Sequence, residues 1–129
     1  MDSTTLTRTL KVYLVEDSEL IRQRLRQLLD ALDYLRIVGE AGDSTAALAG
    51  IADSQAEVAI IDLHLASGSG LTVLKGLAQQ GRPVASIVLT NHATAEFKRE
   101  CLAAGARYFF DKTNEFHLVR QAIRHLADE

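Results

Sequence analysis

The chain has 129 residues, of which 47% are hydrophobic and 24% charged, so it is long enough for one domain with one core and too short for two. Its net charge of −3 does not predict general binding to nucleic acid or to anionic membranes, and no apolar run approaches the length of a membrane span. The single cysteine excludes a disulfide framework, and together with a polar start rather than a signal peptide it predicts a cytoplasmic protein.

Apolar runs and helical stretches alternate along the chain at near-even spacing. Residues 1–9 are polar and threonine-rich, so we expect a flexible N-terminal arm there, followed by one domain at residues 10–129. Short apolar runs predict five strands, at residues 11–15, 36–41, 58–62, 85–90 and 107–111. Segments with helical periodicity or helix-favouring composition predict five helices, at residues 19–32, 46–52, 71–80, 93–104 and 115–126. Ser18 is the expected N-cap of the first helix, and Thr113 or Asn114 that of the last.

The first predicted helix combines an apolar face with a basic one. Apolar side chains recur at helical spacing from Leu20 to Leu32, which predicts that this face packs on the core. Its arginines, Arg22, Arg24 and Arg26, are more simply explained as a solvated face than as a phosphate site.

Strict alternation of strand and helix, five times over, predicts a parallel sheet with helices on both faces. Right-handed crossovers leave few topologies for a chain of this size. We therefore expect an α/β protein with the flavodoxin-like (βα)5 fold, a doubly wound parallel sheet with strand order 2-1-3-4-5. Such a sheet binds ligands at its carboxyl edge, where strands 1 and 3 meet.

Polar residues end four of the five predicted strands. These residues are Glu16 and Asp17, Asp62, Thr90, and Lys112. Each one alone has a simpler explanation, as a turn residue or a solvated charge. The predicted strand order, however, brings all of them to one edge of the sheet, which predicts three carboxylates, a hydroxyl and an ammonium around one crevice.

The chemistry that fits this set is phosphoryl transfer to a carboxylate. Three carboxylates in one place repel each other unless a divalent cation lies among them, and Mg²⁺ prefers such oxygen ligands. Asp62, at the centre, could act as the nucleophile that forms an aspartyl phosphate. Lys112 would neutralise the transferred group, and the Thr90 hydroxyl would donate a hydrogen bond to a phosphate oxygen.

The sequence also resembles the receiver domain of two-component response regulators over about residues 11–127. The resemblance is carried by Leu-Val-Glu-Asp at 14–17, Ile-Ile-Asp-Leu-His-Leu at 60–65, Gly-Ser-Gly-Leu at 68–71, Val-Leu-Thr at 88–90, and Ala-Gly-Ala-Arg-Tyr-Phe-Phe-Asp-Lys at 104–112. It implies that Asp62 is the phosphoacceptor in a phosphorelay, and that the protein is a signalling phosphoprotein rather than an enzyme, with slow self-catalysed phosphorylation and dephosphorylation.

The resemblance implies a role for each of the other site residues. Asp17 would bind Mg²⁺ directly, Glu16 largely through water, and His64 through its backbone carbonyl, alongside Asp62 itself. Thr90 would be the switch hydroxyl, Lys112 the phosphate-binding cation and Phe109 the aromatic switch.

Four positions depart from the usual family pattern. Ala66 stands where proline is usual, and Phe109 lacks the hydroxyl of the tyrosine found in many members. Thr113 also replaces a proline, and a non-proline cis bond costs about 3–4 kcal/mol, which counts against the family's cis peptide here. Asn91 is larger than the usual alanine or glycine and could narrow access to Asp62.

Two histidines flank the predicted site, His64 two residues after Asp62 and His92 two residues after Thr90. One hypothesis is that they modulate the attack of water on the acyl phosphate, by occlusion or hydrogen bonding. The alternative is that both are exposed loop residues without effect. A direct role of either side chain as a metal ligand is disfavoured.

These features predict a stand-alone receiver that takes a phosphoryl group from a histidine kinase or a histidine phosphotransfer protein. Phosphorylation would alter the surface formed by the fourth helix, fifth strand and fifth helix, which would bind an unknown protein target or a second copy in a homodimer, with no direct contact to nucleic acid or membrane. Alternatives are the N-terminal receiver of a longer regulator with DNA-binding or enzymatic output, and a receiver-like binding module that is never phosphorylated. A small phosphatase is disfavoured because His64 stands where such enzymes commonly have an acid.

Overall fold

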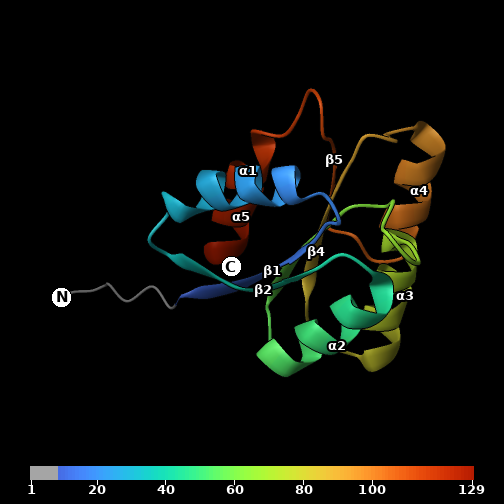
Figure 1. The fold of residues 1–129 in the computed structure, drawn as a ribbon, viewed down its shortest axis with the longest axis horizontal. Coiled ribbons are helices and arrows are strands. Elements are labelled where there is room, and N and C mark those ends of the chain that lie inside the picture. The colour runs from blue at the N-terminus through green and yellow to red at the C-terminus, as the bar shows by residue number, and fades with distance from the viewer. Residues whose placement is uncertain (1–8) are drawn as a thin grey trace.

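The five apolar runs form one parallel sheet, in a computed structural model that describes residues 9–129 (Figure 1). The predicted arm at residues 1–9 lies outside the described residues, apart from Thr9. The strands are β1 (Leu10–Val15), β2 (Leu35–Ala41), β3 (Val58–Ile61), β4 (Ala85–Thr90) and β5 (Tyr108–Asp111). Their order is β2-β1-β3-β4-β5, and every neighbouring pair is parallel, so the predicted fold and strand order are confirmed.

Five helices cover the two faces of this sheet (Figure 1). They are α1 (Glu19–Asp30), α2 (Ser44–Ser54), α3 (Gly70–Gln80), α4 (Ala95–Ala103) and α5 (Leu118–Ala127). Side chains of α1 and α5, such as Leu25 and Ile123, pack on one face, and side chains of α2, α3 and α4 pack on the other. In residues 9–129, no helix combines the length and the apolar character that crossing a membrane requires.

Side-chain caps decide where four of these helices begin. Ser18, Asp43, Ser69 and Thr94 each accept a backbone N–H from the first turn of the helix that follows. Because of these caps, α2 begins two residues earlier than predicted from sequence, and α4 begins at Ala95 rather than at residue 93.

The prediction for the last helix is wrong at its start. Helix α5 begins at Leu118 rather than at residue 115, and neither Thr113 nor Asn114 caps it. The Asp111 carboxylate instead accepts the Thr113 N–H at 2.8 Å, and the Glu115 carboxylate accepts the Asp111 N–H at 2.9 Å. These bonds satisfy the backbone in a separate turn after β5, so the helix starts later.

One leucine predicted to face the core does not. Leu20 is 65% exposed, whereas Leu25 and Leu29 on the same helix are buried. Leu20 lies in the first turn of α1 and is not part of the core cluster that contains Leu25 and Leu29.

Candidate functional site

The site lies at the carboxyl edge of the sheet, where four strands end. All five predicted strand-end residues come together there, with Asp17 exposed and the side chains of Glu16, Asp62, Thr90 and Lys112 buried. Thr90 has no exposed surface at all. These side chains therefore lie together at one edge of the sheet, as the strand order predicted.

Two backbone features fix the position of Asp62. Its N–H donates to the Val15 carbonyl at 2.9 Å, which attaches the end of β3 to the end of β1. Its own carbonyl lies so close to Gly70 that a Cβ there would be only 2.3 Å away. Glycine at this position lets the start of α3 approach the end of β3.

Lys112 lies between two buried carboxylates. Its ammonium donates to Glu16 Oε1 at 2.8 Å and to Asp62 Oδ2 at 3.1 Å. The other oxygen of Asp62, Oδ1, is buried without a hydrogen-bond partner within the described residues. A buried carboxylate oxygen without a partner is costly and points to a ligand.

Glu16, Asp17 and Asp62 form a compact group of oxygen donors. One carboxylate oxygen from each lies within 4.8 Å of those from the other two. Hard oxygen ligands in such number suit Mg²⁺, which binds through one or two carboxylates and leaves room for phosphate oxygens. Oδ1 of Asp62, which has no partner in the described chain, is free to be the ligand atom from this residue, so the residues present fit this ion.

The charges in this cluster shift two pKa values. Burial raises the pKa of Glu16, and the nearby Asp62 charge adds to the rise, while hydrogen bonds from Lys112 and from the Ser18 N–H offset part of it. Burial alone would lower the pKa of Lys112, but the hydrogen bond to Glu16 and the charges of Asp62 and Glu16 outweigh it and raise that pKa. Lys112 is therefore a cation at neutral pH.

Within the described part of the chain, the Thr90 hydroxyl has one hydrogen-bond partner. Its oxygen accepts the N–H of His92 at 3.1 Å, which leaves its own proton available for another acceptor. Phe109, the predicted aromatic switch, pairs with Val88 across the β4–β5 ladder and is 9% exposed.

His64 and His92 lie against each other. Their ring centroids are 3.7 Å apart at an interplanar angle of 32°, and the Phe97 ring lies nearly perpendicular to that of His64, with the two centroids 6.4 Å apart. Both histidines are exposed, as is Asn91. The pair thus bridges the loops that follow β3 and β4, a contact that the sequence alone did not predict.

Sequence reasoning also missed the partner of the Glu16 backbone. Arg22 was predicted to be solvated, yet its Nη1 donates to the Glu16 carbonyl at 2.8 Å. The signal available in the sequence was only that Arg22 lies one turn into the helix that follows Asp17.

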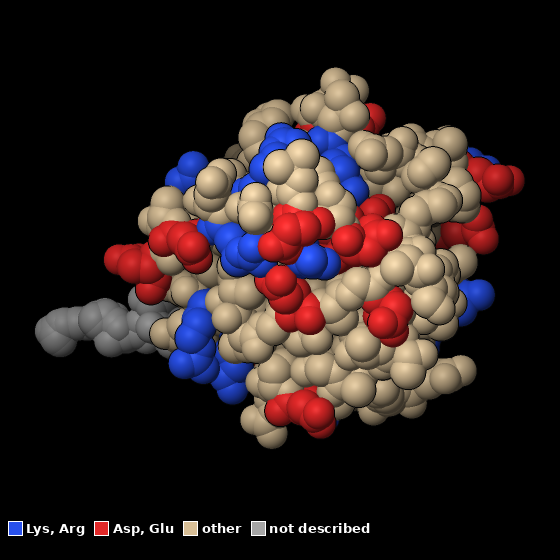
Figure 2. All heavy atoms as spheres, viewed as in Figure 1, with Lys and Arg blue, Asp and Glu red and all other residues tan. Residues whose placement is uncertain are grey.

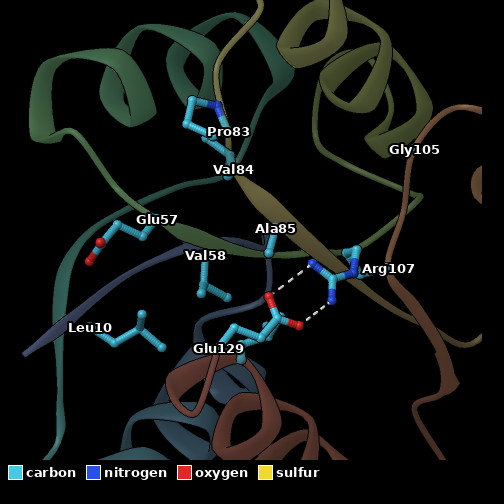
Figure 3. Close-up of a pocket in the computed structure, with 10 residues that line it drawn as sticks. Leu10, Glu57, Val58, Pro83, Val84, Ala85, Gly105, Arg107 and Glu129 are labelled. Carbon is cyan, nitrogen blue, oxygen red and sulfur yellow. Dashed lines mark hydrogen bonds and ion pairs between the residues drawn. The ribbon is translucent and has the colours of Figure 1, made fainter. Parts of the chain in front are cut away.

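A separate hollow of about 470 Å³ lies at the opposite edge of the sheet (Figure 3). It lies at the amino ends of the strands, where Leu10, Val58 and Ala85 contribute to its lining, and the Arg107–Glu129 ion pair lies beside it. None of the strand-end carboxylates lines it, so it is distinct from the site described above.

Comparison with known proteins identifies the class that this fold and site define. The family described as the response regulator receiver domain matches residues 12–124, so the chain belongs to that family. It is 33% identical over 114 residues to the DNA-binding transcriptional activator DevR/DosR of Mycobacterium tuberculosis, covering 88% of this chain and 52% of that protein. It is 35% identical over 101 residues to the transcriptional regulatory protein UhpA of Salmonella typhimurium, covering 78% and 50%. The chain thus spans about half the length of these relatives.

Solved structures support the same fold. The receiver domain of RcsB from Salmonella enterica serovar Typhimurium, determined with the phosphomimetic BeF3−, has a TM-score of 0.86 at 22% identity, covering 94% of this chain and 90% of that one. The response regulator domain of Thermotoga maritima CheB has a TM-score of 0.81 at 23% identity, covering 94% and 95%. Receiver domains are the phosphoacceptors of two-component signalling, and this chain is one of them.

Proposed function

We propose that Asp62 accepts a phosphoryl group from a phosphohistidine on a partner kinase or phosphotransfer protein. The observation that carries this proposal is the asymmetry of its carboxylate: Lys112 binds Oδ2, while the buried Oδ1 has no partner in the described chain. A carboxylate oxygen attacks phosphorus, the bond from phosphorus to the imidazole nitrogen breaks, and the electron pair returns to the histidine ring. The Lys112 ammonium compensates negative charge that gathers on the phosphoryl oxygens.

Glu16, Asp17 and Asp62, with the backbone carbonyl of His64, would hold Mg²⁺ in this site. The bound ion would supply positive charge to the phosphoryl oxygens. The buried Glu16 also holds Lys112 in place, so that the ammonium is directed at Asp62. Self-catalysed phosphorylation from small donors and slow hydrolysis of the aspartyl phosphate belong to the same proposal.

Thr90 and Phe109 are the proposed switch. The free proton of the Thr90 hydroxyl can bond a phosphoryl oxygen on Asp62, which draws β4 toward the modified residue. Phe109 on the neighbouring strand then repacks, and the surface of α4, β5 and α5 shifts between two populations. The rings of Tyr108 and Phe110 stack with their centroids 5.8 Å apart, and both residues are partly exposed. This suits contact with a protein target or a second copy.

The length of the relatives favours a second candidate for the output. The matched segments make up 52% and 50% of these relatives, and their names describe transcriptional regulators, one of them DNA-binding. A receiver followed by a DNA-binding domain would act through that domain, whereas a stand-alone receiver would act by protein contact alone. Sequencing the open reading frame downstream of Glu129 distinguishes the two.

The test of the proposed function is the intact mass after incubation with acetyl phosphate and Mg²⁺. We expect a gain of one phosphoryl group in the wild type, none in Asp62→Asn, and none in the wild type with EDTA. A parallel reaction uses a purified donor protein that carries a phosphohistidine. It controls for the case in which Asn91 blocks small donors such as acetyl phosphate from reaching Asp62. If neither donor modifies the wild type, the chain is a phosphorylation-independent module and the proposal is wrong.

A further inference from the structure

Arg22 lies next to the acidic turn of the site but is not part of the acidic cluster. It lies on α1, one turn after the cap Ser18, and its side chain is 20% exposed. Its Nη1 donates to the Glu16 carbonyl at 2.8 Å. That carbonyl belongs to the peptide joining Glu16 to Asp17, so the guanidinium fixes the peptide from which both acids extend.

The Asp17 side chain depends on this backbone for its position. Asp17 is exposed, and within residues 9–129 its carboxylate has no hydrogen bond or ion pair. The turn is also held by the Glu16 N–H, which donates to the Ala41 carbonyl at 2.9 Å, and by the Ser18 N–H, which donates to Glu16 Oε2 at 3.1 Å. Gly42 approaches it closely, since a Cβ there would lie 3.3 Å from the Asp17 Cα. Among residues 9–129, Arg22 supplies the one side-chain hydrogen bond to the carbonyl of this peptide.

A cation this close to a metal site would normally repel the metal. Two carboxylates neutralise the charge of Arg22: Glu19 accepts from Nη2 at 2.8 Å, and Glu40 lies 3.2 Å from Nε. Arg26 pairs with the same two glutamates, so the four side chains sum to zero net charge. Figure 2 shows acidic and basic side chains lying together in this way at the middle of the face drawn.

We propose that Arg22 is a positioning residue that sets the affinity of the acidic cluster for Mg²⁺. By orienting the Glu16–Asp17 peptide, it holds the exposed Asp17 carboxylate toward Glu16 and Asp62, while Glu19 and Glu40 cancel its charge. The inference rests on the proposed function, since it concerns the same Mg²⁺ site. Partners that orient metal ligands from outside the ligand set commonly affect metal affinity strongly.

The chain offers a matched control for this proposal. Arg26 lies on the same helix one turn further on and pairs with Glu19 and Glu40, but the interactions found for it in the described chain do not reach the acidic turn. Arg26→Met therefore removes one arginine and its ion pairs, as Arg22→Met does, while leaving the Glu16 carbonyl bonded.

The experiment is a calorimetric titration of wild type, Arg22→Met, Arg22→Lys and Arg26→Met with MgCl₂, with urea unfolding of each in EDTA. We expect Arg22→Met to raise the Kd for Mg²⁺ by about tenfold, Arg22→Lys to fall between it and the wild type, and Arg26→Met to differ from the wild type by less than a factor of about two. At saturating Mg²⁺, phosphorylation of Arg22→Met by acetyl phosphate should return to the wild-type rate.

The outcomes separate the two proposals. If the wild type binds Mg²⁺ but Arg22→Met and Arg26→Met shift the Kd equally, or neither shifts it, the positioning role is wrong. The positioning role is also wrong if Arg22→Met loses affinity only because it unfolds, while Arg22→Lys stays folded and keeps the wild-type Kd. If the wild type does not bind Mg²⁺, the proposed site itself is wrong and this inference fails with it.

Discussion

The ammonium of Lys112 lies 2.8 Å from Oε1 of Glu16, a residue 96 positions earlier in the chain. Both side chains are buried, and the same ammonium also bonds Asp62. One cation thus compensates two buried carboxylates, which directly follow the ends of two different strands, β1 and β3. Removing it would leave both carboxylates buried without their charge partner.

We expect Lys112→Met to destabilise the protein in EDTA by about 3–5 kcal/mol, the usual cost of breaking a buried ion pair from one side. Urea unfolding followed by circular dichroism measures this. Lys98→Met is the control, because Lys98 is exposed on α4 and its loss should change the free energy of unfolding little. Equal stabilities of the two variants would contradict the account of the cluster.

A second prediction concerns the pH dependence of stability that comes from Glu16. Its pKa is raised above the ordinary 4.5, chiefly by burial. A raised folded-state pKa means that this group favours folding most below the ordinary value, and that this contribution is lost as the pH rises through the folded-state pKa. In EDTA, the stability of Glu16→Gln relative to the wild type should therefore increase as the pH rises from about 4.5 toward neutrality.

Urea unfolding of both proteins at a series of pH values measures this difference, and titrations of groups that do not interact with Glu16 cancel between them. The hydrogen bond and charge of Lys112 act on the ionised form of Glu16 and offset only part of the effect of burial, so they are already included in the raised folded-state pKa. A difference that stays constant, or that falls as the pH rises, would show that burial does not dominate the environment of Glu16.

The positions of Asp62 and Lys112 in the site could be predicted because they depend only on where strands end and in which order the strands lie. Side chains at the ends of parallel strands meet at one edge whatever their rotamers. Arg22 could not be placed in this way, since its contact depends on a long side chain folding back from a helix to a carbonyl. The start of α5 was missed because Asp111 and Glu115 form hydrogen bonds with nearby backbone, which competes with helix formation.

Mg²⁺ should stabilise the wild type against unfolding, because the three carboxylates of the proposed site are brought together only in the folded chain. At a free concentration of 100 times its Kd, the gain is about 2.7 kcal/mol. Asp17→Asn should lose most of this gain yet unfold like the wild type in EDTA, because Asp17 is exposed and its proposed role is that of a metal ligand rather than a packing residue. Thermal unfolding with MgCl₂, with EDTA and with NaCl at matched ionic strength measures it. An equal gain in both proteins would mean that Mg²⁺ binds elsewhere.

Tyr13 and Gly50 fit each other closely, since a Cβ on Gly50 would lie 2.0 Å from the Tyr13 hydroxyl oxygen. Gly50→Ala should therefore destabilise the protein by about 1–3 kcal/mol through overpacking, less the roughly 1 kcal/mol that alanine gains over glycine within a helix. Tyr13→Phe removes the oxygen that the new methyl would meet. In a double-mutant cycle followed by urea unfolding, the loss caused by Gly50→Ala should be smaller in the Tyr13→Phe background; an equal loss would place the strain elsewhere.

The contact between His64 and His92 leads us to expect that these residues slow hydrolysis of the aspartyl phosphate. Their rings lie 3.7 Å apart and join the loops after Asp62 and Thr90, so together they can restrict the approach of water to an aspartyl phosphate. Replacing either histidine with alanine should speed dephosphorylation severalfold. Because each ring supports the other, the acceleration of dephosphorylation in the double variant should be smaller than the product of the accelerations in the two single variants.

Loss of the phosphoryl group, followed by intact mass after removal of the donor, measures this rate. His117→Ala is the control, because His117 is exposed at the start of α5 and should leave the rate unchanged. Rates equal to the wild type in both single variants would show that the two histidines are exposed loop residues without effect on the site. Fully multiplicative effects would show that each acts alone, and that the contact between the rings has no part in protecting the phosphate.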